Sequence, residues 1–330
     1  MKQNIAIIAG GDSGEYGISI KSGSVVAEML PREAFNPFLI QIKGQDWFFK
    51  KEGKKYAIDK NDFSLTIDNQ KIVFDCVFCA IHGDPGENGK LPAYFELLRI
   101  PYTACDTLAS ALTFNKNLCN RVVASYGVDV AGSVHLYKNQ DVDFAGIEKN
   151  LNMPVFVKPN AGGSSVGMTK VKNAADLPKA IARAFEEDDE VLIEEFVEGR
   201  ELTCGVLEHK GRMIVLPICE IISKNEFFDY EAKYNPALAD EIVPANIESE
   251  LETGIKHTTA MLYKKLNCRG IVRADYIYCK KNDSLYFIEI NTVPGLTRES
   301  IVPKMAREMG ITLSELFTMA VEAALARHVQ

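Results

Sequence analysis

Three oxygen-bearing side chains and one guanidinium near the end of the chain have the types and spacing of a metal-binding site. Arg273 and Asp275 lie two residues apart in one apolar run, and Glu289 and Asn291 lie two residues apart in the next. Because alternate residues of a β-strand point to the same side, each pair would share one face of its strand. Carboxylate and amide oxygens, together with phosphate oxygens of a substrate, are the ligands that Mg²⁺ prefers. The alternative interpretation is an ordinary strand pair with a polar face.

The elements around these four residues read as a β-hairpin. Apolar and polar residues alternate in 271–278 and 285–290, and the polar segment 280–283 separates the two runs. This pattern predicts two antiparallel strands that bring the pairs together. The following segment, TVPGLT (292–297), has the residues of a turn that directs backbone N–H groups at an anion.

A second candidate site begins where a predicted strand, 155–159, opens into NAGGSSVGM (160–168). Small residues leave N–H groups and hydroxyls accessible to phosphate oxygens, and Lys158 adds a positive charge. The order differs from GxxxxGK[ST], so this segment is not a P-loop. The alternative is a plain linker.

Two more glycine-rich segments follow predicted buried strands, GGDSGEYG (10–17) and HGDPGENG (82–89). In α/β proteins, ligands bind at the carboxyl ends of strands, so these segments are candidates for one shared site. Glu15 either caps the following helix or faces a cationic group of a substrate. His82 is either a ligand contact or a structural histidine.

Carboxylates also lie at the end of the predicted strand 191–196 and shortly after it. Glu194, Glu195 and Glu201 could accept hydrogen bonds from an adenine amino group or ribose hydroxyls, or they could mark a solvated edge. The segment 224–236 mixes aromatic and charged residues without a sustained period, which is typical of a lid over a site.

Composition indicates a soluble globular protein of two or three domains, with 330 residues, 47% of them apolar and 25% charged. The net charge of −8 provides no general attraction to nucleic acid or anionic membranes. Apolar runs are too short to span a bilayer, and residues 4–9 read as a strand rather than a signal peptide. We therefore expect a cytoplasmic protein. The eight cysteines lack a zinc pattern, and we expect reduced thiols.

The periodicity of the remaining chain predicts its other elements. A Thr312–Glu315 capping box should start the last helix, with a buried stripe at residues 313, 316, 317, 320, 321 and 324. The charged segment 38–66 reads as an irregular surface excursion. We expect helices at 19–30, 91–99, 107–127, 177–187 and 247–266, and strands at 5–9, 72–81, 100–103, 202–208 and 212–218.

Six motifs taken in order are similar to those of the D-alanine–D-alanine ligase family of the ATP-grasp superfamily. They are GGDSGEYGIS (10–19), HGDPGENG (82–89), KPNAGGSSVGM (158–168), DYEAKY (229–234), RADY (273–276) and EINTVPGLT (289–297). The resemblance implies an α/β (α+β) multidomain fold. Its parts would be an N-terminal open α/β domain (1–104), a small central ATP-grasp domain (105–197) and a C-terminal ATP-grasp domain (198–330) with a lid at 224–243.

The resemblance also implies roles for individual residues. Asp275, Glu289 and Asn291 would hold two Mg²⁺ ions, with Mn²⁺ as a substitute. Glu15 would bind the ammonium of the first D-alanine, supported by Ser164 and Tyr234. Its carboxylate would lie among His82, Arg273 and Gly295, and the carboxylate of the second D-alanine would lie at Ser300 and Ile301. Contacts to ATP would come from Lys116, Lys158, Ser165, Glu194, Val197, Glu201 and, in the lid, Lys233.

The implied function is ATP-dependent ligation of two D-alanines through a D-alanyl phosphate, for peptidoglycan precursors, by a homodimer that uses only small-molecule substrates. Gly17, Gly162 and Phe228 depart from residues frequent in the family, which affects only contacts around the site. The rival hypotheses are D-lactate or D-serine as the second substrate, a biotin-carboxylase-like ligase, and a non-catalytic nucleotide-binding module.

Overall fold

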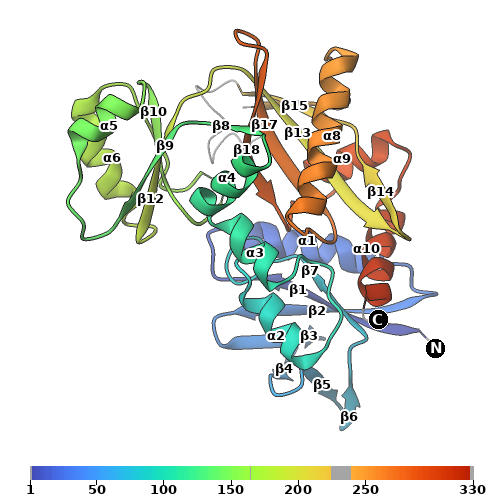
Figure 1. Ribbon diagram of the computed structural model, residues 1–330. Helices are drawn as coiled ribbons and strands as arrows, with labels where there is room; N and C mark the ends of the chain where they lie inside the picture. Colours follow the sequence, from blue (N-terminus) through green and yellow to red (C-terminus); the bar gives the residue numbers. More distant parts are fainter. Residues whose placement is uncertain (1, 164, 224–238, 328–330) are drawn as a thin grey trace.

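The computed structural model describes residues 2–163, 165–223 and 239–327 and arranges them around three β-sheets (Figure 1). In the first sheet, the order is β6-β5-β4-β3-β2-β1-β7, with β1 parallel to both of its neighbours. Helices α1 (Tyr16–Met29) and α2 (Lys90–Leu98) belong to this part of the chain. Its strands are β1 (Gln3–Gly10), β2 (Phe35–Lys43), β3 (Asp46–Lys51), β4 (Lys54–Asp59), β5 (Ser64–Ile67), β6 (Gln70–Ile72) and β7 (Cys76–Cys79).

The prediction of an irregular excursion at 38–66 was wrong, because this segment supplies the antiparallel strands from β2 to β5. Its lysines lie on exposed positions, while most of its aromatic residues pack into the core of this sheet. There Phe38 packs edge-on against Phe49, with ring centroids 5.5 Å apart, and Trp47 packs against Phe63. Burial of this aromatic face outweighs the polar character of the exposed one.

The boundaries of other elements also differ from those predicted. The predicted helix 107–127 is two helices, α3 (Thr107–Phe114) and α4 (Lys116–Ser125), separated at Asn115, which caps α4 by accepting a hydrogen bond from Leu118 N. The predicted strand 100–103 is a single bridge between Val77 and Tyr102. Strand 72–81 is confirmed only at β7, and α1 begins three residues earlier than expected.

The second sheet has four strands in the order β11-β10-β12-β9. Helices α5 and α6 cover one side of it (Figure 1), and their apolar residues form a separate small core with the strands. These elements are β9 (Ser133–Tyr137), α5 (Phe144–Asn150), β10 (Val155–Pro159), β11 (Thr169–Val171), η1 (Ala174–Asp176), α6 (Leu177–Ala184) and β12 (Glu190–Glu195).

The third sheet contains the predicted hairpin, with the order β16-β15-β13-β17-β18-β8 and β14 paired to β13. Helices α3, α4 and α8 contribute to the core on this sheet. Its elements are β8 (Asp129–Val130), β13 (Arg200–His209), β14 (Arg212–Val215), β15 (Cys219–Ser223), β16 (Ala239–Ile242), α8 (Ser249–Lys265), β17 (Val272–Cys279), β18 (Ser284–Asn291), α9 (Ile301–Glu308) and α10 (Leu313–Arg327).

The first and third sheets share one core, in which α1 and α10 lie side by side (Figure 1). The predicted buried stripe of α10 is confirmed, and its Phe317 packs edge-on against Phe78 of β7 at 5.6 Å between centroids. The capping box is confirmed as well, since Glu315 accepts from Thr312 N at 2.8 Å and Thr312 Oγ1 accepts from Glu315 N. All eight cysteines are free thiols.

No single helix of the described residues has the length and apolar character of a membrane span. The helices α9 and α10 reach that length only when counted together, and a bend of 104° separates them.

Replacing Phe317 by Ala should lower the free energy of unfolding by about 3–5 kcal/mol, because it opens a cavity where two sheets meet. Denaturation by urea, followed by circular dichroism, measures this change. Leu97 in α2 is a suitable control because it is 85% exposed, and its replacement by Ala should change stability by less than about 0.5 kcal/mol. Equal losses for the two variants would contradict the shared core.

Candidate active site

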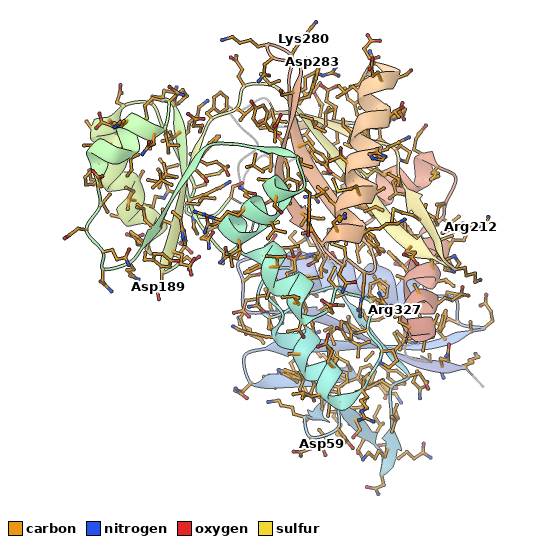
Figure 2. All side chains as sticks on the ribbon, viewed as in Figure 1. Asp59, Asp189, Arg212, Lys280, Asp283 and Arg327 are labelled. Atoms are coloured by element: carbon orange, nitrogen blue, oxygen red, sulfur yellow. The ribbon has the colours of Figure 1, made fainter. Side chains whose placement is uncertain are left out.

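Two cavities adjoin the β17–β18 hairpin and share part of their lining. Their volumes are about 520 Å³ and 820 Å³, and both are lined by Lys116, Gly162, Gly163, Arg273 and Glu289. The turn of the hairpin, with Lys280 and Asp283, projects away from the body of the protein (Figure 2). The opposite end, which carries the four residues singled out in the sequence, therefore lies inside.

Strand register brings these four residues together as predicted. Arg273 pairs with Asn291, and Asp275 pairs with Glu289. The Arg273 guanidinium donates from Nε and Nη2 to the two oxygens of Asp275, both at 2.7 Å. Asn291 Nδ2 donates to Asp275 Oδ2 at 2.9 Å, and the hydroxyl of Thr203 on β13 donates to Oδ1. The Asp275 carboxylate is thus fixed by four donors.

Negative charge exceeds positive charge around Arg273. Burial acts to lower the pKa of Arg273, but the carboxylates of Asp275, Glu289 and Glu87 outweigh it and raise that pKa. The described residues contain no cluster of three or more His, Cys, Asp or Glu arranged as a metal cage. A divalent cation here would need the Asn291 amide oxygen and oxygens of a bound substrate besides the two carboxylates, which is the ligand set that suits Mg²⁺.

The smaller cavity gathers the described residues that were predicted to contact ATP. Lys158 is the last residue but one of β10, and its Nζ lies 2.6 Å from Glu194 Oε2 on β12, with both side chains buried. Asn120 of α4 donates to the other oxygen of Glu194 at 2.9 Å. All six of the described candidates line this cavity: Lys116, Lys158, Ser165, Glu194, Val197 and Glu201.

Lys116 connects the glycine-rich loop to the hairpin. It is the first residue of α4, and its Nζ donates to Gly162 O at 2.6 Å and lies 3.9 Å from Glu289 Oε2. The same loop reaches the N-terminal part of the chain, because a Cβ atom added at Gly163 would lie 2.8 Å from Glu15 Oε2. Only glycine fits at Gly163 without displacing that carboxylate.

The larger cavity gathers the described residues predicted to bind the amino acids, namely Glu15, His82, Arg273, Gly295, Ser300 and Ile301. The Glu15 side chain makes no capping hydrogen bond although it precedes α1, so the structure does not support the capping interpretation. Ser300 precedes α9, and its hydroxyl accepts from Thr297 N at 3.1 Å. Ser300 and Ile301, at the N-terminus of α9, both line this cavity, and the dipole of a helix favours an anion near its N-terminus.

His82 is bound on both ring nitrogens by the protein itself. Its Nδ1 lies 2.7 Å from Val293 O, and its Nε2 lies 3.1 Å from Ser22 Oγ of α1. Burial lowers the pKa of His82, so the ring is neutral. Because a carbonyl only accepts, Nδ1 carries the proton and Nε2 accepts from the Ser22 hydroxyl.

Glu87 had no predicted role, although it lies within the HGDPGENG motif. Its two oxygens accept hydrogen bonds from Gly83 N at 2.7 Å and from Val293 N at 2.9 Å. Burial, with a further contribution from Glu15, raises the pKa of Glu87 to about 7. The only sign of a role for Glu87 in the sequence was its position among glycine and proline residues, and ordinary turns also contain acidic residues in such positions.

Three of the predicted site residues, Ser164, Lys233 and Tyr234, lie outside the described residues, and so does Phe228. Of the predicted lid at 224–243, the structure describes 239–243, in which β16 pairs antiparallel with β15.

Stability should depend on pH through Glu87. The folded protein keeps this carboxyl protonated up to about pH 7, whereas its ordinary pKa is 4.5, so rising pH removes stability between these values. Glu87→Gln removes this dependence. Its stability relative to wild type should therefore rise by on the order of 3 kcal/mol from pH 4.5 to 8.

Urea denaturation at several pH values between 4.5 and 8 measures this difference. Glu148→Gln, on the exposed side of α5, is the control and should follow wild type at every pH. A constant difference between Glu87→Gln and wild type would contradict the raised pKa.

Comparison with known proteins assigns the chain to a family. Family models described as D-ala D-ala ligase N-terminus and C-terminus match residues 4–105 and 123–322. A relative from Flavobacterium johnsoniae named D-alanine–D-alanine ligase is 46% identical over 325 residues, which are 98% of this chain and all of that protein.

Solved structures agree with the sequence matches. VanG D-Ala:D-Ser ligase from Enterococcus faecalis has a TM-score of 0.87 at 33% identity, covering 98% of this chain and 100% of that one. D-alanyl-alanine synthetase A from Vibrio cholerae has a TM-score of 0.89 at 28% identity, covering 98% and 99%. The two family models together account for nearly the whole chain. The chain belongs to the D-alanine–D-alanine ligase family.

Proposed function

We propose that this protein is an ATP-dependent ligase that joins two D-alanines into D-alanyl-D-alanine for peptidoglycan precursors. The observation that carries the proposal is the position of the hairpin end, where Arg273 and Glu289 line both cavities. A nucleotide in one cavity and amino acids in the other would meet there. A non-catalytic nucleotide-binding module would not require this shared wall.

The chemistry follows from the poor reactivity of a carboxylate. One oxygen of the first D-alanine carboxylate attacks the γ-phosphorus of ATP, and ADP leaves. The amine of the second D-alanine then attacks the carbonyl carbon of the acyl phosphate, loses a proton, and phosphate departs. Phosphoryl transfer depends mainly on positioning and on charge neutralisation, which suits a site built from Lys116, Lys158 and a metal.

Asp275, Glu289 and Asn291 would hold two Mg²⁺ ions, or Mn²⁺ in their place, and the ions would neutralise phosphate charge. Asp275 would exchange at least one of its four hydrogen-bond donors for the metal. Arg273 is fixed on Asp275 by its bidentate fork and would face the reacting carboxylate. The N–H of Gly295 donates to no acceptor among the described residues, so it can bind the developing oxyanion together with Arg273.

Substrate binding is proposed as follows. Glu15 would pair with the ammonium of the first D-alanine, with Ser164 and Tyr234 in support. Ser300 and Ile301, at the start of α9, would bind the carboxylate of the second. Lys233 and the lid at 224–243 would close over the phosphates and exclude water, which would otherwise hydrolyse the acyl phosphate. Because both nitrogens of His82 are engaged, we assign it to holding the turn rather than to direct contact with substrate.

We also propose three functional parts with boundaries near residues 104 and 197. Within the middle part, α3, α4 and β8 pack on the third sheet, so the four-stranded sheet with α5 and α6 is the unit free to close over ATP. A cytoplasmic homodimer remains the expected state, and sedimentation velocity measures its mass.

A second candidate is ligation of D-alanine to D-serine, because the VanG structure carries that name at 33% identity. D-lactate is a further alternative for the second substrate. Competition between D-alanine and each of these for the acyl phosphate, read by product mass, ranks them directly.

Phosphate release with ATP and Mg²⁺ tests the function. D-alanine should support turnover and give a product with the mass of the dipeptide, and L-alanine should not, because Glu15 and Arg273 would fix the ammonium and carboxylate at once. Comparable phosphate release with both enantiomers would contradict the proposal.

Replacing Glu289 by Gln should raise the Mg²⁺ concentration needed for half-maximal activity by at least about tenfold, because a charged oxygen ligand is lost. Titration of activity with MgCl₂ at saturating ATP measures the shift, with Glu148→Gln as the control. An unchanged Mg²⁺ dependence would place the metal elsewhere.

A further inference from the structure

Side chains from the N-terminal part of the chain form hydrogen bonds to the backbone of the turn 292–297. It follows Asn291 directly and carries Gly295, so its position sets both a proposed metal ligand and a proposed oxyanion donor. Thr292, Val293 and Leu296 are all buried. A small displacement of such a turn moves groups that act on the reaction.

Both backbone groups of Val293 are bound by the segment 82–89. His82 Nδ1 donates to Val293 O at 2.7 Å, and Glu87 Oε1 accepts from Val293 N at 2.9 Å. On the far side of Gly295, Ser22 Oγ accepts from Leu296 N at 3.3 Å. Gly295 therefore lies between two backbone positions that side chains from α1 and the 82–89 segment hold in place.

Ionisation of the Glu87 carboxyl is unfavourable at this position. The described residues place no cation within ion-pair distance of Glu87, and Glu15 and Glu289 add repulsion. Both of its oxygens are nevertheless used, one for Val293 N and one for Gly83 N, which ties the turn to the loop that follows β7. An amide offers only one acceptor oxygen and would leave one of these N–H groups without a partner.

We propose that Glu87 and Ser22 are positioning residues for the ligation, which hold the turn so that the Gly295 N–H meets the oxyanion. The inference rests on the proposed function, and it assigns these residues no contact with a substrate. They affect the rate by fixing the position of the backbone from 293 to 296.

Glu87→Gln and Ser22→Ala test the inference in dipeptide formation. Each should lower kcat by about 10- to 100-fold, since a displacement of about 1 Å can cost up to that factor. Because the oxyanion forms only in the transition state, kcat/KM for D-alanine should fall equally and KM should stay close to wild type. ATP affinity, measured by calorimetry, should change less than about twofold, because Lys158 and Glu194 belong to the other cavity.

Glu315→Gln is the matched control. Glu315 is also a glutamate whose carboxylate accepts a backbone N–H, but it does so in the capping box of α10 and lies outside the linings of both cavities. This variant should lose some stability and keep the kcat of wild type. If it lost kcat to the same extent as Glu87→Gln, general loosening of the protein would explain both results, and the inference would fail.

The double variant Glu87→Gln, Ser22→Ala gives a second measurement. Since both residues hold one turn, the combined loss of kcat should be clearly smaller than the product of the single losses. Multiplicative losses, a KM effect without a kcat effect, or single variants within twofold of wild type would each overturn the inference. Those outcomes leave the wild-type activity intact, whereas failure of the proposed function would appear as no dipeptide from the wild-type enzyme.

Discussion

The Asp275 carboxylate is the group around which the site is organised. Its two oxygens receive the fork of Arg273, the amide of Asn291 and the hydroxyl of Thr203, and these donors come from three adjacent strands of one sheet. Removing a charge from such a network would leave an uncompensated partner in a poorly hydrated place, which is strongly unfavourable. The network therefore fixes the geometry of both cavities at their shared wall.

Excess negative charge follows from the same arrangement. Glu15, Glu87 and Glu289 lie around one Arg273 and one Lys116. Burial raises the pKa of Glu87 and the neighbouring carboxylates raise it further, while the carboxylates around Arg273 raise its pKa against the effect of burial. A cationic ligand relieves this imbalance of charge. Divalent metal ions and a substrate ammonium are the cations that the proposed reaction brings to this place, so the imbalance favours binding of both.

The three sheets contribute unequally to this arrangement. The first and third sheets share a core through α1 and α10, which makes the N-terminal segment 82–89 a rigid support for the turn after β18. The second sheet has its own small core and meets the others through the Gly162–Gly163 loop and Lys116. The Gly162–Gly163 loop of the second sheet thus contributes to the lining of both cavities.

The hairpin, the glycine-rich loops, the capping box and the buried stripe of α10 could all be predicted from the sequence, because each depends on local spacing and on which residue types suit a strand, turn or helix end. The sequence also supplied the motifs that identify the family. The prediction for 38–66 was wrong because the many lysines suggested a solvated segment. Its aromatic residues are buried only after β2 to β5 have paired and formed a core. Only the tertiary structure decided what Glu87, Ser22 and Thr203 do. Their partners are backbone groups and carboxylates far away in the chain, and which distant groups meet is set by how the sheets pack, not by the residues beside them.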